Sequence, residues 1–394
     1  MTALRTQVAI VGAGPAGLTL AQILHRRGIE SILIERRGRE YVERRLRAGV
    51  LEQGTVDLLH SIGVGDRMDR EGLVHHGVHL QFVGERHRIA LSELTGGRAI
   101  TVYGQHEVVK DLIAARLAYA GQIFFDADAV QLGDIETEHP VVRFHCNDTD
   151  YALQCDFIAG CDGSHGSCRS LIPAEKVTTW ERKYPCSWLG ILAAVPPSLD
   201  EIIYAWHERG FALHSMRTPE ITRLYVQCPP DDELSAWPDE RVWGELMLRL
   251  ATTDGWSLQE GAVLEKSISA MRSFVMEPMQ HGRLYLAGDA AHVVPPTGAK
   301  GMNLAIADVR VLGEAIATWY RTGDPQPLER YSSTCLRRVW RAEHFSWWMT
   351  TMLHRFPGDD DFQAKLQLAQ LRYVCTSTAA ATSFAENYVG LEHV

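Results

Sequence analysis

The spacing of apolar and polar residues at the start of the chain is typical of alternating strands and helices. Residues 6–11 form a short apolar run that ends on glycine, residues 15–27 carry apolar side chains at helical spacing, and residues 31–35 form a second apolar run. Such runs predict buried parallel strands, and the segment between them predicts the connecting helix. This order is the opening of a doubly wound α/β fold.

The pattern then changes to that of antiparallel strands. A helix is predicted near residues 105–119, and residues 122–157 alternate in short stretches broken by polar turns, as in a β-meander. Alternation continues between residues 184 and 268, which predicts a separate antiparallel sheet with one helix near residues 239–250.

The last part of the chain returns to a buried strand and then becomes helical. Residues 284–287 are an apolar run, a long helix is predicted over residues 300–321, and the tail from residue 329 is helical. The tail is rich in tryptophan and methionine, including Trp340 and Trp347. These side chains fit either core packing or the face of a homodimer, because interfaces are enriched in aromatic residues and methionine.

Composition and charge narrow the possible partners. The 394 residues carry a net charge of −10, which argues against nucleic acid as a general partner. No apolar stretch reaches the roughly 18 residues that span a membrane. The eight cysteines form no CxxC pair and no zinc-ligand spacing, so we predict no metal site. Residues 1–5 are too short for a secretory signal, and we expect a reducing cytoplasm.

The first turn carries a glycine signature with a mechanical reason for each glycine. Gly12 permits a tight turn, Gly14 lets the backbone approach a pyrophosphate, and Gly17 lets the helix pack closely on the strand. Glu35 ends the next strand, where its carboxylate can accept hydrogen bonds from a ribose. The signature predicts a bound dinucleotide but does not distinguish NAD from FAD.

Two later turns decide between these dinucleotides. Asp162 lies in Cys-Asp-Gly-Ser after one apolar run, and Asp289 lies in Gly-Asp-Ala-Ala-His after another. Together with the glycine signature, and in this order, they resemble the flavoprotein aromatic hydroxylases, the group A monooxygenases. The resemblance implies FAD, with Asp289 at the ribityl chain and the helix beginning near Gly301 directed at the isoalloxazine. It implies further FAD contacts at Arg45, Arg47, Gln105, Arg223, Lys300, Met302 and Asn303.

These features lead to a division of the chain. We expect an α/β fold in which a Rossmann-like FAD-binding domain, residues 1–180 and 271–328, is interrupted by an inserted antiparallel β-sheet substrate domain, residues 181–270. Residues 329–394 form a helical C-terminal region, the expected dimer interface.

Further blocks extend the resemblance over nearly the whole chain, toward the branch of the family that acts on 4-hydroxybenzoate. These blocks are residues 45–54, 72–75, 210–213, 273–283, 341–349 and 385–391. They imply conversion of 4-hydroxybenzoate to 3,4-dihydroxybenzoate with NADPH and O2, through a flavin C4a-hydroperoxide. A related substrate such as 4-aminobenzoate, or a non-catalytic flavin-bound sensor, is the alternative.

The substrate carboxylate has a candidate anchor on one strand. Residues 211–217 alternate, so Ser215 and Arg217 share a face and offer a hydroxyl and a bidentate guanidinium. Spacing alone favours a surface ion pair at Arg217 and a solvated Ser215, and the resemblance reverses this preference. The resemblance assigns Ser215, Arg217 and Tyr225 to the carboxylate and places Arg223 near the flavin.

The other end of the substrate is a phenol whose proton must leave. The resemblance implies a relay of Tyr204, Tyr388 and His75, with imidazole at the solvent end because it titrates near neutral pH. His76, the next residue, is a competing candidate. The resemblance also places Pro296, Thr297 and Asn303 around the aromatic ring of the substrate.

NADPH has no second glycine-rich unit to bind it. The resemblance implies transient binding along a short helix after the second strand, with Arg36, Tyr41 and Arg45 at the phosphates. A solvated basic helix face is the alternative, and we favour NADPH over NADH.

Four residues depart from the family pattern: Cys186, Ser187, Trp206 and His214. By strand alternation His214 faces away from Ser215, whereas Trp206 shares the face of Tyr204 and could alter the relay or the pocket rim.

Overall fold

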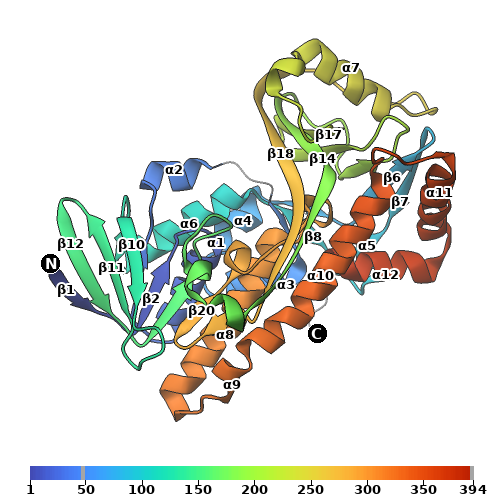
Figure 1. The fold of residues 1–394 in the computed structure, drawn as a ribbon. Coiled ribbons are helices and arrows are strands. Elements are labelled where there is room, and N and C mark those ends of the chain that lie inside the picture. The colour runs from blue at the N-terminus through green and yellow to red at the C-terminus, as the bar shows by residue number, and fades with distance from the viewer. Residues whose placement is uncertain (46–48, 391–394) are drawn as a thin grey trace.

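The computed structural model of the chain describes residues 1–45 and 49–390, and it confirms the predicted α/β class (Figure 1). A six-stranded sheet in the order β19-β20-β13-β2-β3-β9 forms the first layer. Its strands are β2 (Val8–Val11), β3 (Ser31–Ile34), β9 (Ile123–Phe124), β13 (Phe157–Gly160), β19 (Gln280–His281) and β20 (Leu284–Leu286). All residues of β2, β3, β13 and β20 are buried, as expected of a parallel sheet covered on both faces.

Three helices pack with this sheet where the sequence pattern predicts them. They are α1 (Pro15–Arg26), α6 (Gln105–Ala118) and α8 (Gly301–Thr322). The connection after β3 holds the short helices α2 (Arg39–Arg44), α3 (Gln53–Ser61), α4 (Asp66–Glu71) and α5 (Leu91–Leu94). A three-stranded sheet made of β4 (Val50–Leu51), β8 (Ile100–Val102) and β5 (Leu73–His75) lies in the same connection.

The predicted meander is present at one end of the molecule (Figure 1). Strands β10 (Asp128–Gly133), β11 (Val141–Cys146) and β12 (Thr149–Gln154) run antiparallel. The N-terminal strand β1 (Thr2–Arg5) pairs parallel with β12. The hydrophobic pattern did not indicate β1, because its side chains are mostly exposed.

The sheet predicted as antiparallel has eight strands in the order β21-β18-β14-β17-β16-β15-β6-β7, and all its neighbours are antiparallel except β15 and β6, which pair parallel. Two of them, β14 (Thr178–Ala194) and β18 (Ala262–Glu277), are long and reach back toward the six-stranded sheet (Figure 1). The others are β6 (Val78–Phe82), β7 (Glu85–Ile89), β15 (Ile203–Ala205), β16 (Ala212–Thr218), β17 (Ile221–Cys228) and β21 (His292–Val293). The sheet thus draws β6 and β7 from a segment that the sequence pattern assigned to the other domain.

Helices cover both faces of this sheet. On one face α7 (Asp239–Arg249) packs through Val242, Trp243 and Leu246. On the other face lie the tail helices α10 (Tyr331–Leu353), α11 (Asp361–Thr376) and α12 (Thr378–Val389), which follow α9 (Gln326–Glu329). The tail therefore supplies core to the substrate sheet, and the Trp340 and Trp347 side chains stay partly exposed.

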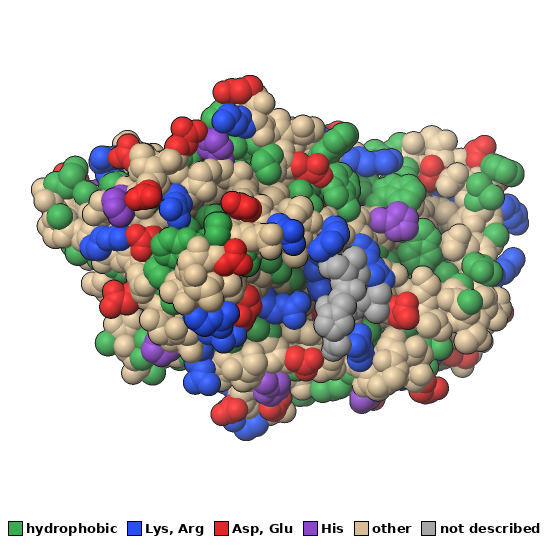
Figure 2. Space-filling model, turned by 90° about the horizontal axis from the view of Figure 1, so that it is seen from below, with side chains coloured by type: hydrophobic (Ala, Val, Ile, Leu, Met, Phe, Trp, Pro, Cys, Tyr) green, Lys and Arg blue, Asp and Glu red, His purple; other side chains and the backbone are tan. Residues whose placement is uncertain are grey.

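The face of the molecule seen in Figure 2 does not carry a single sign of charge. Acidic and basic side chains are interspersed over the face of the molecule drawn in Figure 2. Within residues 1–45 and 49–390, no helix combines the length and apolarity needed to cross a membrane.

Candidate functional site

The glycine turn at the carboxyl end of β2 has the form that a dinucleotide needs. Gly12 has φ +108°, and a Cβ there would lie 2.3 Å from the carbonyl oxygen of Cys161. A Cβ on Gly17 would lie 2.0 Å from the Gly12 oxygen. A Cβ on Gly14 would meet nothing within 4 Å. Gly12 and Gly17 thus allow the turn to close tightly. Gly14 leaves space before the amino terminus of α1, which has no side-chain cap and whose backbone N–H groups can bind phosphate.

Glu35 holds this turn in place. One carboxylate oxygen accepts a 2.8 Å hydrogen bond from the Ala13 amide, and the other accepts one of 2.8 Å from the Arg37 amide. A carboxylate has about four acceptor positions, so both oxygens can still accept a ribose hydroxyl.

The two acidic turns follow β13, which lies beside β2 in the sheet, and β20, which lies on the other side of β13. Asp162 accepts a 2.9 Å hydrogen bond from the Cys168 amide, and its other carboxylate oxygen is buried without a partner. Asp289 is exposed, and its carbonyl accepts a 2.7 Å hydrogen bond from Arg169. Because parallel strands end at one edge, the three turns share the place where ligands of α/β sheets bind.

The amino terminus of α8 is tied to the loop before α3. Lys300 donates 2.7 Å and 2.9 Å hydrogen bonds to the Glu52 carboxylate and the Tyr388 carbonyl. Burial lowers the pKa of Lys300, and Glu52 opposes this shift. Asn303 accepts from the Glu52 amide at 2.9 Å and from Thr55 at 2.8 Å. The side chains of Lys300 and Asn303 are therefore engaged within the protein.

The other predicted FAD contacts differ in setting. Gly301 is the first residue of α8, and a Cβ there would meet nothing within 4 Å, so its backbone is open to a ligand. Met302 and Gln105 are half-buried, and Arg45 is exposed. Arg47 lies outside the described residues.

Strand register gathers the predicted substrate residues on one face of the second sheet. Tyr204 on β15 pairs with Leu213 on β16, which pairs with Tyr225 on β17. Ser215 pairs with Arg223 in the same way. His214 faces the opposite side, where it accepts a 3.1 Å hydrogen bond from the Ser198 amide, which confirms the predicted direction.

Two arginines on this face have no acidic partner. Among the described residues, no carboxylate forms an ion pair with Arg217 or Arg223, and the Nε atom of each is buried without a hydrogen bond. Burial, and secondarily the positive charge of Arg223, lower the pKa of Arg217, while Tyr225 opposes them. A Cβ on Gly190 would lie 2.7 Å from Arg223 Nη2, so a glycine makes room for this guanidinium. Buried cations without anions are costly, and the site is therefore suited to a bound anion.

Tyr204 and Tyr388 meet across the core, although 184 residues separate them. Their hydroxyl oxygens lie 2.6 Å apart, and each side chain is 2% exposed. Burial raises the pKa of both phenols. His75 is also buried, which lowers its pKa to about 4, and neither ring nitrogen has a partner among the described residues. The structure joins the two tyrosines directly but does not join His75 to them.

The remaining residues of the predicted relay and ring wall are placed as follows. His76 bonds to Ser92 at 2.9 Å on the exposed side, which separates it from the tyrosines. Pro296 and Thr297 form a short turn held on α10, where the Thr297 and Thr350 hydroxyls lie 2.8 Å apart. The Trp206 indole donates a 2.8 Å hydrogen bond to Gln367 on α11, so it anchors the tail helices.

The predicted NADPH residues lie around α2. Arg36, Tyr41 and Arg45 are all exposed, and the Arg37 guanidinium lies 5.2 Å from the centre of the Tyr41 ring. Ion pairs between residues four apart neutralise other charges of this helix, at 2.6 Å for Arg39 with Glu43. The surface around α2 is therefore basic. This fits both predicted interpretations, a site for the NADPH phosphates and a solvated basic helix face.

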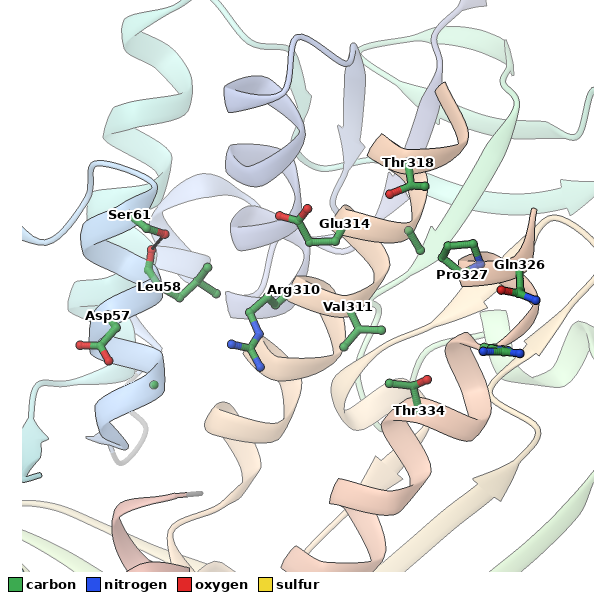
Figure 3. A pocket seen from close by; sticks show the side chains of 13 residues that line it. Asp57, Leu58, Ser61, Arg310, Val311, Glu314, Thr318, Gln326, Pro327 and Thr334 are labelled. Carbon is green, nitrogen blue, oxygen red and sulfur yellow. Dashed lines mark hydrogen bonds between the residues drawn. The ribbon is translucent and has the colours of Figure 1, made fainter. Parts of the chain in front are cut away.

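A groove of about 780 Å³ lies elsewhere, between α3, α8, α9 and α10 (Figure 3). It is lined by mixed charges that include Asp57, Arg310, Glu314 and Arg330. None of the predicted site residues lines it.

Known proteins place the chain in a family. A family model described as an FAD binding domain matches residues 5–346. A protein of Acinetobacter baylyi named p-hydroxybenzoate hydroxylase is 49% identical over 393 residues, which cover 100% of this chain and 97% of that relative. The chain belongs to the FAD-dependent aromatic hydroxylases. The predicted family, the FAD cofactor and the enzyme class are thereby confirmed.

A more distant relative and a solved structure are also similar to the chain. The 3-amino-4-hydroxybenzoate 2-monooxygenase of Streptomyces cremeus is 27% identical, over 84% of each chain. The crystal structure of p-nitrophenol 4-monooxygenase from Pseudomonas putida superposes with a TM-score of 0.84, at 17% identity over 100% of both chains. At that identity the likeness concerns the fold alone.

The sequence prediction missed the aromatic residues that back the site of this FAD-dependent aromatic hydroxylase. Trp188 packs 5.0 Å from Phe211 and 4.9 Å from Tyr225 between ring centres. Its indole donates a 2.7 Å hydrogen bond to His354 at the end of α10. Alternation along β14 could have placed Trp188 on this face, but no sequence signal joins it to His354.

The glycine turn yields a paired prediction. We expect Gly14→Ala to fold normally, because its φ of −78° suits alanine, and to bind FAD about tenfold more weakly, or about 1.4 kcal/mol. We expect Gly17→Ala to lose about 1–3 kcal/mol of stability from overpacking. Flavin titration and thermal unfolding of both apoproteins distinguish them. Equal FAD affinity of Gly14→Ala and wild type would contradict the assignment.

Buried histidines predict a loss of stability in acid. Burial lowers the pKa of His75 and His214 to about 4, and that of His354 to about 3, from the ordinary 6.5. The unfolded chain takes up protons below pH 6.5 and the folded chain does not, so stability is complete above pH 6.5 and falls toward pH 4. Glu343, whose pKa burial raises to about 7, offsets part of this fall.

The measurement is the unfolding midpoint of wild type and His214→Phe between pH 7.5 and pH 4.5, in steps of about half a unit. The variant lacks one of the three groups, so its midpoint should fall less steeply. Parallel profiles would show that His214 is not held neutral.

Proposed function

We propose that this chain hydroxylates 4-hydroxybenzoate at the 3-position to 3,4-dihydroxybenzoate, with NADPH and O2. The observation that carries the proposal is a pair of arginines, the half-buried Arg217 and the buried Arg223, on the same sheet face as Tyr204, to which no carboxylate is paired within residues 1–45 and 49–390. The name of the 49% identical relative supports the substrate.

In this proposal the carboxylate binds to Arg217, Ser215 and Tyr225. The Ser215 hydroxyl makes only a 3.4 Å contact with the Met216 carbonyl, so it is free to donate to the substrate. The Arg217 guanidinium supplies a bidentate fork, and Tyr225 supplies a further hydroxyl. The aromatic ring then lies between this anchor and Tyr204, beside Pro296 and Thr297.

The phenolic proton leaves through the tyrosine pair. Tyr204 accepts the proton on its hydroxyl oxygen and gives its own to Tyr388, since both hydroxyls are protonated at neutral pH. Tyr388 in turn releases its own proton toward His75. Because His75 is buried and is not joined to the tyrosines in this structure, this last transfer requires a bridging water or a movement of the imidazole, and His75 does not lie at the solvent end that the sequence predicted. The ring becomes electron-rich at the carbon beside the phenolate, where oxygen is added.

FAD would be held by Gly12, Gly14, Gly17, Glu35, Gln105, Asp162, Asp289 and the start of α8 from Lys300 to Asn303, with Arg45, Arg47 and Arg223 nearby. When bound it supplies hydride acceptance from NADPH and activation of O2. Arg36, Tyr41 and Arg45 would bind the NADPH phosphates.

We also propose a cytoplasmic homodimer. Trp180 and Trp340 are 52% and 41% exposed, and their rings pack 6.1 Å apart. Trp347, about two turns further along α10, is 36% exposed. Exposed aromatic side chains of this kind suit an interface between copies, and the free thiols of the eight cysteines suit a reducing compartment.

The substrate assignment is tested by NADPH oxidation and product analysis with a panel of 4-hydroxybenzoate, 4-aminobenzoate and phenol. We expect 4-hydroxybenzoate to stimulate oxidation and to be hydroxylated. Arg217→Lys should raise its KM about tenfold or more, because the loss of one charge-assisted hydrogen bond corresponds to about 1.5–3 kcal/mol. Stimulation by phenol, which has no carboxylate, should not change in this variant. Peroxide as the sole product, or preference for another benzoate, would overturn the assignment.

The relay is tested by Tyr204→Phe and Tyr388→Phe. Each should bind 4-hydroxybenzoate nearly as wild type does and hydroxylate about a hundredfold more slowly, as expected on loss of general acid–base catalysis. Tyr331→Phe is the matched control, because Tyr331 is fully buried and donates a 2.7 Å hydrogen bond to the Leu286 carbonyl. Hydroxylation at the control's rate in both relay variants would refute the roles.

A further inference from the structure

One face of α10 carries a buried series of hydrogen-bonding residues, four positions apart. Ser346, Thr350 and His354 are each 0% exposed. The Thr350 hydroxyl donates a 2.7 Å hydrogen bond to the Ser346 carbonyl. A threonine hydroxyl has one hydrogen, so in the 2.8 Å contact with Thr297 the Thr297 hydroxyl is the donor. The turn at 296–298 is thus fastened to α10.

The same face reaches the substrate sheet through His354. Trp188 can only donate, so the 2.7 Å contact of its indole nitrogen with His354 Nε2 requires that this nitrogen carry no proton. The proton therefore lies on Nδ1, which donates to the Thr350 carbonyl at 2.9 Å. Burial keeps the ring neutral, since it lowers the His354 pKa to about 3.

Both ends of this series touch residues of the proposed substrate pocket. Trp188 packs against Tyr225, and the His354 ring stacks 4.5 Å from Phe211 on the same sheet face. At the other end, Thr297 lies in the turn beside the proposed ring position. One helical turn, a rise of about 6 Å at about 1.5 Å per residue, separates Thr350 from His354.

We propose that the series Trp188–His354–Thr350–Thr297, named here the α10 strut, determines substrate length. This proposal rests on the proposed function. The strut fixes the spacing between the carboxylate anchor and the turn beside the ring. Neither end can shift alone, because a shift would leave a buried donor or acceptor without a partner. The strut residues act by positioning Tyr225, Phe211 and Pro296 and do not touch the reacting atoms.

The test compares 4-hydroxybenzoate with 4-hydroxyphenylacetate, which is longer by one CH2 group. His354→Phe keeps the stacking on Phe211 but cannot accept from Trp188, and Thr350→Val keeps the shape but removes the hydroxyl. We expect each to raise the KM for 4-hydroxybenzoate about threefold to tenfold, as a buried hydrogen bond predicts. The ratio of kcat/KM for the longer acid over the shorter should rise by a similar factor.

Two further variants separate positioning from stability. Thr350→Ser restores the hydroxyl and should restore selectivity. Ser332→Ala removes a buried hydroxyl from the other end of α10, where it accepts a 2.9 Å hydrogen bond from the Met279 amide, and should leave the ratio unchanged. His354→Phe combined with Thr350→Val should be less than additive, because the two break one series. Should His354→Phe fail to fold, Thr350→Val and Thr350→Ser alone still decide the result.

The proposal is overturned if the variants change KM for both acids equally, or if Ser332→Ala changes the ratio as they do. Wild-type turnover of 4-hydroxybenzoate tests the proposed function separately. If the wild type prefers another benzoate, selectivity is measured between that compound and its homologue with one additional CH2 group. The strut is then still confirmed or rejected by the shift in that ratio.

Discussion

The constraint on which the proposed substrate face depends is that the Arg223 guanidinium is buried and that of Arg217 half-buried, with no carboxylate paired to either in the described part of the chain. Removing a cation from water costs several kcal/mol after relaxation, and Arg217 and Arg223 both incur it. The protein accommodates them through strand register and through Gly190, whose missing side chain makes room for Arg223. A bound carboxylate would offset this desolvation cost. Part of the stability that the protein loses by removing the guanidinium groups from water would therefore strengthen the binding of the carboxylate.

The same two charges bear on the chemistry proposed for the phenol. A benzoate whose hydroxyl has lost its proton carries two negative charges, and two arginines on one face balance them. Tyr204 and Tyr388 stay protonated because burial raises their pKa values, so they carry a proton and do not compete with the substrate for positive charge. In a site of low polarity, each arginine stabilises the phenolate more than it would in water.

Motifs near turns were predictable from the sequence, and contacts between distant segments were not. Gly12, Gly14 and Gly17 have fixed local roles, and strand alternation placed Ser215 and His214 on opposite faces. The pairing of Tyr204 with Tyr388 came only from family resemblance, since no local pattern relates residues 184 positions apart. The bond of Trp188 to His354 had no signal, because it depends on how α10 crosses the sheet. For the same reason β6 and β7 were not assigned to the second sheet: strand pairing is decided by neighbours in space.

The helical tail joins the two halves of the site. Lys300 begins the turn into α8, where the FAD isoalloxazine would lie, and its ammonium group is bonded to the carbonyl of Tyr388. Tyr388, the second residue of the proposed proton relay, therefore shares a buried cation with the amino terminus of the helix proposed to face the cofactor. Its other bond, to Glu52, opposes the lowering of the Lys300 pKa that burial causes. A displacement of α12 would break the Lys300–Tyr388 bond and the Tyr204–Tyr388 bond together, so proton exit and the cofactor helix depend on the same packing of the C-terminal region.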